Sequence, residues 1–126
     1  LMDRIDMQIN LSRVEFSELK TKEKGESSAA IRERVVKARL LQQERLEALG
    51  MHCNAQMGRS EVVKYCQLDA AAQNVMERYF NMLNLSARSH DRILKVARTI
   101  ADLAGSENIE AVHLAEAIQL RTSVRP

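Results

Sequence analysis

The chain has 126 residues, 45% of them apolar and 29% charged, which is typical of a globular protein with one domain. Its formal net charge of +2 gives no strong argument for nucleic-acid binding. No apolar run approaches the roughly 20 residues of a membrane span, and no signal-peptide pattern is present. We therefore expect a cytoplasmic protein without membrane contact, whose two cysteines are free thiols.

The chain opens with a pattern of period two. Ile5, Met7, Ile9 and Leu11 alternate with polar residues, which predicts a short, half-buried β-strand. A lone strand leaves backbone groups unpaired, so this strand belongs to a sheet upstream or to a contact with another chain. Because the chain also starts with Leu rather than Met, we expect it to be a piece of a longer protein.

Polar residues 17–26 are predicted to form a linker, and apolar residues recur at helical spacing after it. Helices are expected over residues 27–49, 60–66, 70–83, 85–103 and 110–121. Ser27 or Ser28, Asp69 and Ser86 are candidate N-caps, and Gly50 and Gly105 are candidate stops. The predicted fold is all-α, a bundle of four to five helices preceded by one short strand.

The helix over residues 85–103 carries the main candidate site. Its apolar stripe faces away from a basic row of Arg88, Arg92 and Lys95, spaced one turn apart. Arg88 lies in the first turn, where the helix dipole disfavours a cation unless an anion lies beside it. Two interpretations remain open: a solvated arginine on an exposed face, or a phosphate receptor formed with helix N–H groups.

Several blocks along the whole chain, in the same order, resemble the magnesium chelatase-like branch of AAA+ ATPases, in particular the ComM competence family. These blocks are DRIDMQI (3–9), GESSAAIRERV (25–35), NAQM (54–57), LSARSHDRILKVARTIADL (85–103) and HLAEAIQLR (113–121). The resemblance implies that residues 1–16 hold the last strand of the ATPase core. Residues 27–122 would then form the α-helical lid, and residues 123–126 a tail.

The resemblance also implies roles for three arginines. Arg88 resembles the second-sensor arginine of the lid, which reaches the γ-phosphate of ATP in its own subunit. Arg92, one turn on, is either a further phosphate contact or the partner of an acidic neighbour. Arg4 resembles an arginine finger that acts in trans on ATP held by the next subunit.

For the whole protein, the resemblance implies ATP and Mg²⁺ as cofactors, the upstream core and neighbouring ring subunits as partners, and commonly a hexamer. It further implies motor activity on DNA during natural transformation. Insertion of Mg²⁺ into a porphyrin is a weaker implication. The 126 residues contain no GxxxxGK[ST] motif and no Walker B-like run, so we expect no enzyme activity and no bound cofactor in this chain alone.

Two alternatives stay open beside this interpretation. The chain could be a freestanding helical module that binds an acidic partner or nucleic acid through Arg88, Arg92 and Lys95. Zinc binding is the weakest hypothesis, because the relevant residues match no finger or ribbon spacing, and we expect no metal site. The residues concerned are His52, Cys53, Cys66 and His113.

Overall fold

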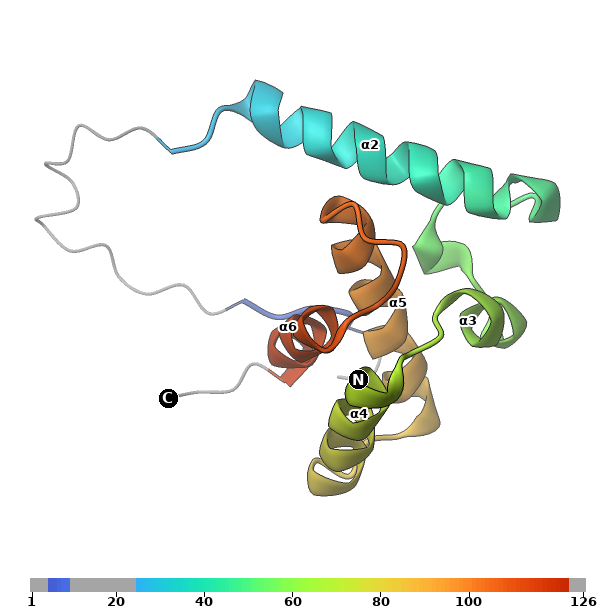
Figure 1. Ribbon diagram of the computed structural model, residues 1–126, viewed down its shortest axis with the longest axis vertical. Coiled ribbons are helices and arrows are strands. Elements are labelled where there is room, and N and C mark those ends of the chain that lie inside the picture. The colour runs from blue at the N-terminus through green and yellow to red at the C-terminus, as the bar shows by residue number, and fades with distance from the viewer. Residues whose placement is uncertain (1–4, 10–24, 123–126) are drawn as a thin grey trace, which may run out of the picture.

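The computed structural model describes residues 5–9 and 25–122, which contain five helices and no sheet (Figure 1). The helices are α2 (Ser28–Leu46), α3 (Arg59–Tyr65), α4 (Ala70–Met82), α5 (Ala87–Leu103) and α6 (Ala111–Thr122). Two 3₁₀ turns, η2 (Glu47–Leu49) and η3 (Asn54–Gln56), join α2 to α3. The prediction of an all-α bundle of four to five helices is confirmed. Within the described ranges, no helix is both long and apolar enough to cross a bilayer.

Side-chain caps fix the start of the three longest helices, as the sequence predicts. Ser27 accepts a hydrogen bond from Ala30 N at 3.2 Å, Asp69 from Ala72 N at 2.8 Å, and Ser86 from Ser89 N at 3.1 Å. Each bond satisfies a backbone donor that has no partner inside the helix. The first long helix ends at Leu46, three residues early, because Glu47–Leu49 tighten into a 3₁₀ turn before Gly50.

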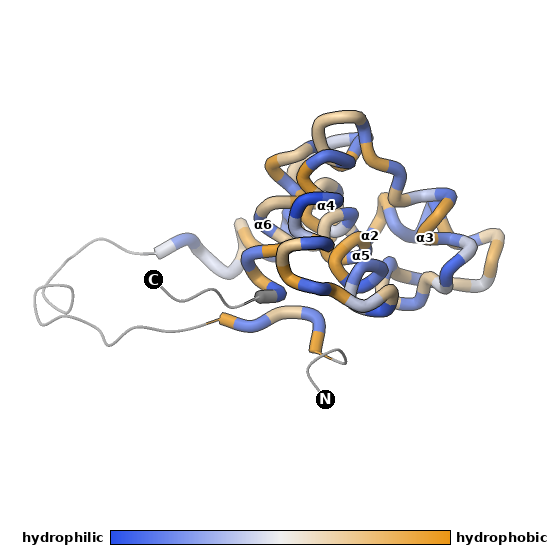
Figure 2. Tube along the Cα trace, turned by 90° about the horizontal axis from the view of Figure 1, so that it is seen from below, coloured by the Kyte–Doolittle hydropathy of each residue, from blue (hydrophilic) through white to orange (hydrophobic). Residues whose placement is uncertain are grey.

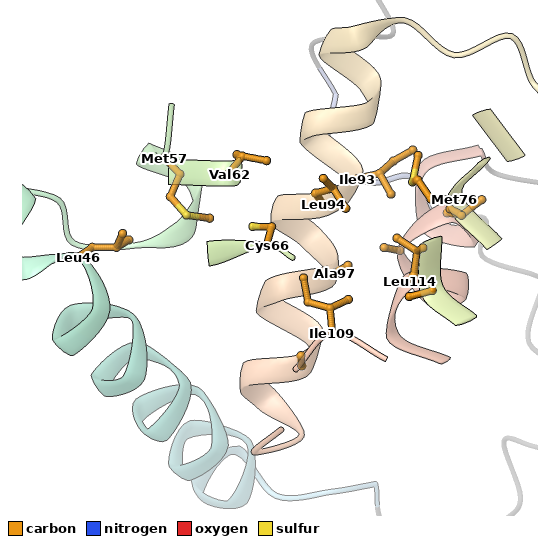
Figure 3. Close-up of a cluster of buried hydrophobic side chains, with 14 residues drawn as sticks. Leu46, Met57, Val62, Cys66, Met76, Ile93, Leu94, Ala97, Ile109 and Leu114 are labelled. Carbon is orange, nitrogen blue, oxygen red and sulfur yellow. The ribbon is translucent and has the colours of Figure 1, made fainter. Parts of the chain in front are cut away.

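The hydrophobic core surrounds α5. Ile93, Leu94 and Ala97 of this helix are at most 5% exposed and have buried partners on both sides (Figure 3). Cys66 and Val62 approach from the α3 side, whereas α4 and α6 supply the opposite side. Of the predicted apolar stripe of α5, Ile93 and Ala97 are buried, Val96 and Ile100 are partly buried, and Leu103 is 42% exposed.

Only the C-terminal half of α2 packs against the bundle. Its buried residues are Ala38, Gln42 and Leu46, while Ile31 and Val35 are each 43% exposed. Figure 1 shows the N-terminal half of α2 extending past the end of α5. The other helices therefore cover only part of the length of α2.

The described part of the predicted strand, residues 5–9, is not assigned as a strand. Gln8 N donates to Leu120 O of α6 at 2.7 Å, and the segment runs beside the end of that helix (Figure 2). A strand requires a ladder with a second strand, and the described residues offer none. The rest of the predicted strand and linker residues 17–24 lie outside the described residues.

Candidate functional site

Arg88 occupies the first turn of α5, two residues after the N-cap Ser86. Its side chain is exposed, and it makes no hydrogen bond or ion pair with any residue that the structure describes. Ser86 caps one N–H group of this turn, while other first-turn N–H groups have no intrahelical partner. A free guanidinium therefore lies beside the positive end of a 17-residue helix, an arrangement that favours an anion.

A hollow of about 320 Å³ lies next to Arg88, between α5 and the start of α3. Four cations and one carboxylate are among its lining residues, namely Arg59, Arg88, Arg92, Lys95 and Asp91. Arg59 forms an ion pair with Asp91, so its guanidinium is already compensated. Lys95 Nζ lies 3.3 Å from Met57 O and 3.5 Å from Ala55 O. The remaining excess of positive charge suits a multiply charged anion.

Arg92 forms an ion pair with an acidic residue, while its contact with phosphate stays a prediction. Its Nη1 donates to Asp6 Oδ1 at 2.5 Å, across 86 residues of sequence. Its Nε is buried and has no hydrogen-bond partner among the residues that the structure describes. The pair links the N-terminal segment to the helix that carries Arg88.

Sequence reasoning missed a polar cluster at the other end of α5. Asp102 is 2% exposed, and its Oδ1 accepts hydrogen bonds from Arg45 Nη2 at 2.7 Å and Arg98 Nε at 3.2 Å. Arg98 also donates to Ser106 O at 2.7 Å and Glu107 O at 2.8 Å, which ties down the loop after α5. Asn54 joins through a bond from its Nδ2 to Asp102 Oδ2 at 2.9 Å. Arg98 and Asp102 lie in the LSARSHDRILKVARTIADL block and Asn54 in the NAQM block, whereas Arg45 lies in neither, and only the fold shows that they meet.

The pKa values of the two arginines in this cluster are shifted in opposite directions. The hydrogen bond to Asp102 raises the pKa of Arg45. Burial lowers the pKa of Arg98, and the charge of Asp102 opposes this effect. Both guanidiniums are held on one carboxylate inside the protein, and the exposed Arg88 shares none of these contacts.

The four residues considered for zinc do not converge. Among the described residues, no group of three or more His, Cys, Asp or Glu side chains is arranged to hold a metal ion. His113 Nδ1 instead accepts a hydrogen bond from Glu110 N at 3.0 Å. Cys66 is buried at 3% exposure, and burial raises the pKa of its thiol to about 11. A thiol in this state is a core residue and a poor ligand or nucleophile.

Comparison with known proteins decides the family. Residues 25–121 match the family model described as "Magnesium chelatase, subunit ChlI C-terminal". The chain belongs to this family. The match covers the five helices except the last residue of α6, and it includes Arg88, Arg92 and Arg121. Arg4 lies outside both the matched and the described residues.

Named relatives of this magnesium chelatase C-terminal domain agree with that assignment. The chain is 40% identical to "Competence protein ComM" of Haemophilus influenzae over 98% of its own length and 24% of the relative. It is 37% identical to "Uncharacterized protein YifB" of Escherichia coli over 95% of its length and 23% of that protein. The chain thus spans about a quarter of these relatives and corresponds to the helical C-terminal domain of ComM- and YifB-like proteins.

Proposed function

We propose that the chain is the lid of an AAA+ ATPase, in which Arg88 contacts the γ-phosphate of ATP held by an upstream core. The observation that carries the proposal is the state of Arg88. It is exposed, it is unpaired among the described residues, and it is mounted at the positive end of α5 beside a basic hollow. Membership of the magnesium chelatase C-terminal family supports the lid assignment.

The chemistry of the γ-phosphate explains why an arginine suits this position. A guanidinium stays charged and offers a planar fork of donors that matches two phosphate oxygens. During phosphoryl transfer it neutralises negative charge on the transferred group. Arg88 has no ion pair with the described residues. Its guanidinium could therefore bind ATP without first breaking a contact with any of them.

The contact between Arg92 and Asp6 gives a route from the nucleotide to the rest of the protein. Asp6 belongs to the segment that the family resemblance assigns to the core, and Arg92 lies one turn after Arg88 on α5. A change in the position of α5 on ATP binding or hydrolysis would therefore act on the core segment through this pair. In this way the lid would couple its motion to the nucleotide state.

The proposal for the whole protein extends beyond this chain. ATP would be bound with Mg²⁺ by the core, and Arg4 would act as an arginine finger on the next subunit of a ring, commonly a hexamer. The name of the Haemophilus influenzae relative, a competence protein, supports a motor that acts on DNA during transformation. The family description supports porphyrin metallation as the second candidate, because it names magnesium chelatase.

The test is ATP turnover by the longer protein that contains this chain. Arg88→Ala should reduce turnover by roughly 100-fold or more, as expected for the loss of a cation that stabilises phosphoryl transfer. Arg39→Ala, an exposed arginine on α2, is the matched control and should turn over ATP like the wild type. Mixing Arg88→Ala with Arg4→Ala should restore part of the activity, since the two side chains would serve different subunits. Wild-type turnover by Arg88→Ala would overturn the proposal.

The freestanding-module alternative makes a different prediction. The basic hollow favours it only if this chain alone binds duplex DNA, with an affinity that falls steeply with salt as phosphate contacts require. Such binding, lost in Arg88→Ala and combined with unchanged ATP turnover of the longer protein, would favour the interaction module over the lid.

A further inference from the structure

A side chain of α6 forms a hydrogen bond with the first turn of α5. Arg121, in the final turn of α6, donates from Nη2 to Ser89 Oγ at 3.2 Å. Ser89 is the residue next to Arg88, and its N–H donates to the cap oxygen of Ser86 at 3.1 Å. Ser86 Oγ in turn donates to Ser89 Oγ at 3.2 Å. Arg88 therefore lies inside a capped turn whose inner side is fixed by a guanidinium from another helix.

The contact between Arg121 and Ser89 is buried, and packing alone does not explain why an arginine is found there. Arg121 is 8% exposed and Ser89 is 6% exposed, yet the other terminal nitrogen of Arg121, Nη1, is buried and has no hydrogen-bond partner among the described residues. A buried donor that is left unpaired costs free energy, so an apolar side chain of similar length would serve packing as well or better. The guanidinium at this position is explained if its hydrogen bond to Ser89 has a role other than packing.

We propose that Arg121 is a positioning residue which, through Ser89, holds the first turn of α5 so that Arg88 is preorganised for phosphate. The inference rests on the proposed function of Arg88. Helix ends fray readily, and a frayed first turn would present Arg88 in many orientations. Each additional orientation lowers the fraction of molecules that can bind phosphate, and with it the apparent affinity.

Arg98 offers a control, since it is also a buried arginine and lies on α5 itself, near the other end of the helix. It is 4% exposed and bonds to Asp102 and to the loop after α5, ten residues and about 15 Å along the helix from Arg88. Loss of Arg98 should lower stability without changing how Arg88 is oriented. A general structural role and a positioning role therefore predict different behaviour for the two arginines.

The experiment measures the affinity of the longer protein for a non-hydrolysable ATP analogue. Arg121→Met, which keeps an unbranched stem but removes the donors, should weaken binding roughly fivefold, on the scale of one hydrogen bond. Arg121→Lys, which keeps one donor, should recover part of the loss. In an Arg88→Ala background, Arg121→Met should have no further effect, because the two residues act in series. Arg98→Met should lower the melting temperature and show no such dependence on Arg88.

Each result bears on a different part of the proposal. A loss caused by Arg121→Met that persists in the Arg88→Ala background, or no loss at all, overturns the positioning role while the function of Arg88 stands. An Arg88→Ala variant that binds the analogue like the wild type overturns the proposed function and the inference together. If Arg121→Met does not fold, Ser89→Ala tests the same link, and the same dependence on Arg88 is expected.

Discussion

Arg45 of α2 and Asp102 of α5 form a two-point ion pair, with Nη2 2.7 Å from Oδ1 and Nη1 3.0 Å from Oδ2. The same carboxylate accepts from Arg98, so one buried anion serves two cations. This cluster and the buried Leu46 attach α2 to the bundle through its C-terminal half alone. The C-terminal half of α2 is therefore held by a buried ion pair as well as by apolar packing.

Removing the charge of Asp102 should strongly destabilise the fold. Asp102→Asn leaves two guanidiniums without their counter-ion in the interior, so the free energy of unfolding of this chain should fall by about 3–5 kcal/mol. Urea unfolding followed by circular dichroism measures the change. Glu33→Gln, which breaks the exposed pair with Lys37, is the control and should leave the midpoint nearly unchanged. Similar midpoints for both variants would show that the buried cluster contributes little.

Burial of the Cys66 thiol should make stability fall in alkaline solution. The pKa of this thiol is raised from 9.0 to about 11 in the folded chain, chiefly by burial. Below pH 9 the thiol is protonated in both states, so its contribution is fully present. Between pH 9 and 11 only the unfolded chain loses the proton, which should remove about 2–3 kcal/mol of stability over that range.

The Cys66→Ala variant isolates this effect from other groups that titrate in the same range. The difference in free energy of unfolding between the wild type and Cys66→Ala should be constant up to about pH 9, and should then shift against the wild type as the pH rises. A difference that stays constant to pH 11 would mean that the thiol titrates normally in the folded protein.

Gly105 ends α5 in a left-handed conformation, with φ at +72°. Its N–H bonds to Asp102 O at 3.1 Å, and Ser106 N bonds to Ala101 O at 2.8 Å, which closes the C-terminal turn. The space around a Cβ at this position is open, so Gly105→Ala tests backbone strain alone and should cost about 1 kcal/mol. Thermal melting measures this, with Gly25→Ala, also in open space but without positive φ, expected to be neutral.

Local signals in the sequence were sufficient for the helices. Ser27, Asp69 and Ser86 cap the helices as predicted, because a cap depends only on residues three or four positions apart. Ile93 and Ala97 of the predicted α5 stripe are buried, but Val96 and Ile100 are only partly buried and Leu103 is exposed. Period and capping are local properties, whereas burial depends on the whole bundle.

The polar contacts of the site could not be predicted in the same way. Arg59 and Asp91 are 32 residues apart, Ser89 and Arg121 also 32, and Arg45 and Asp102 57. No spacing rule joins residues so distant, and each side chain is consistent with a solvated surface until the fold brings its partner close. The position of Arg88 was predictable because it depends only on where its own helix begins. Its role in ATP binding stays a prediction.

The most direct test of the central claim compares ATP with ADP. A side chain that touches the γ-phosphate should matter for the nucleotide that carries this group and hardly at all for the one that lacks it. In the longer protein, Arg88→Ala should weaken binding of a non-hydrolysable ATP analogue by roughly tenfold or more, the scale of charge-assisted hydrogen bonds, and leave ADP affinity within about twofold. Equal losses for both nucleotides, or no loss for either, would contradict the account.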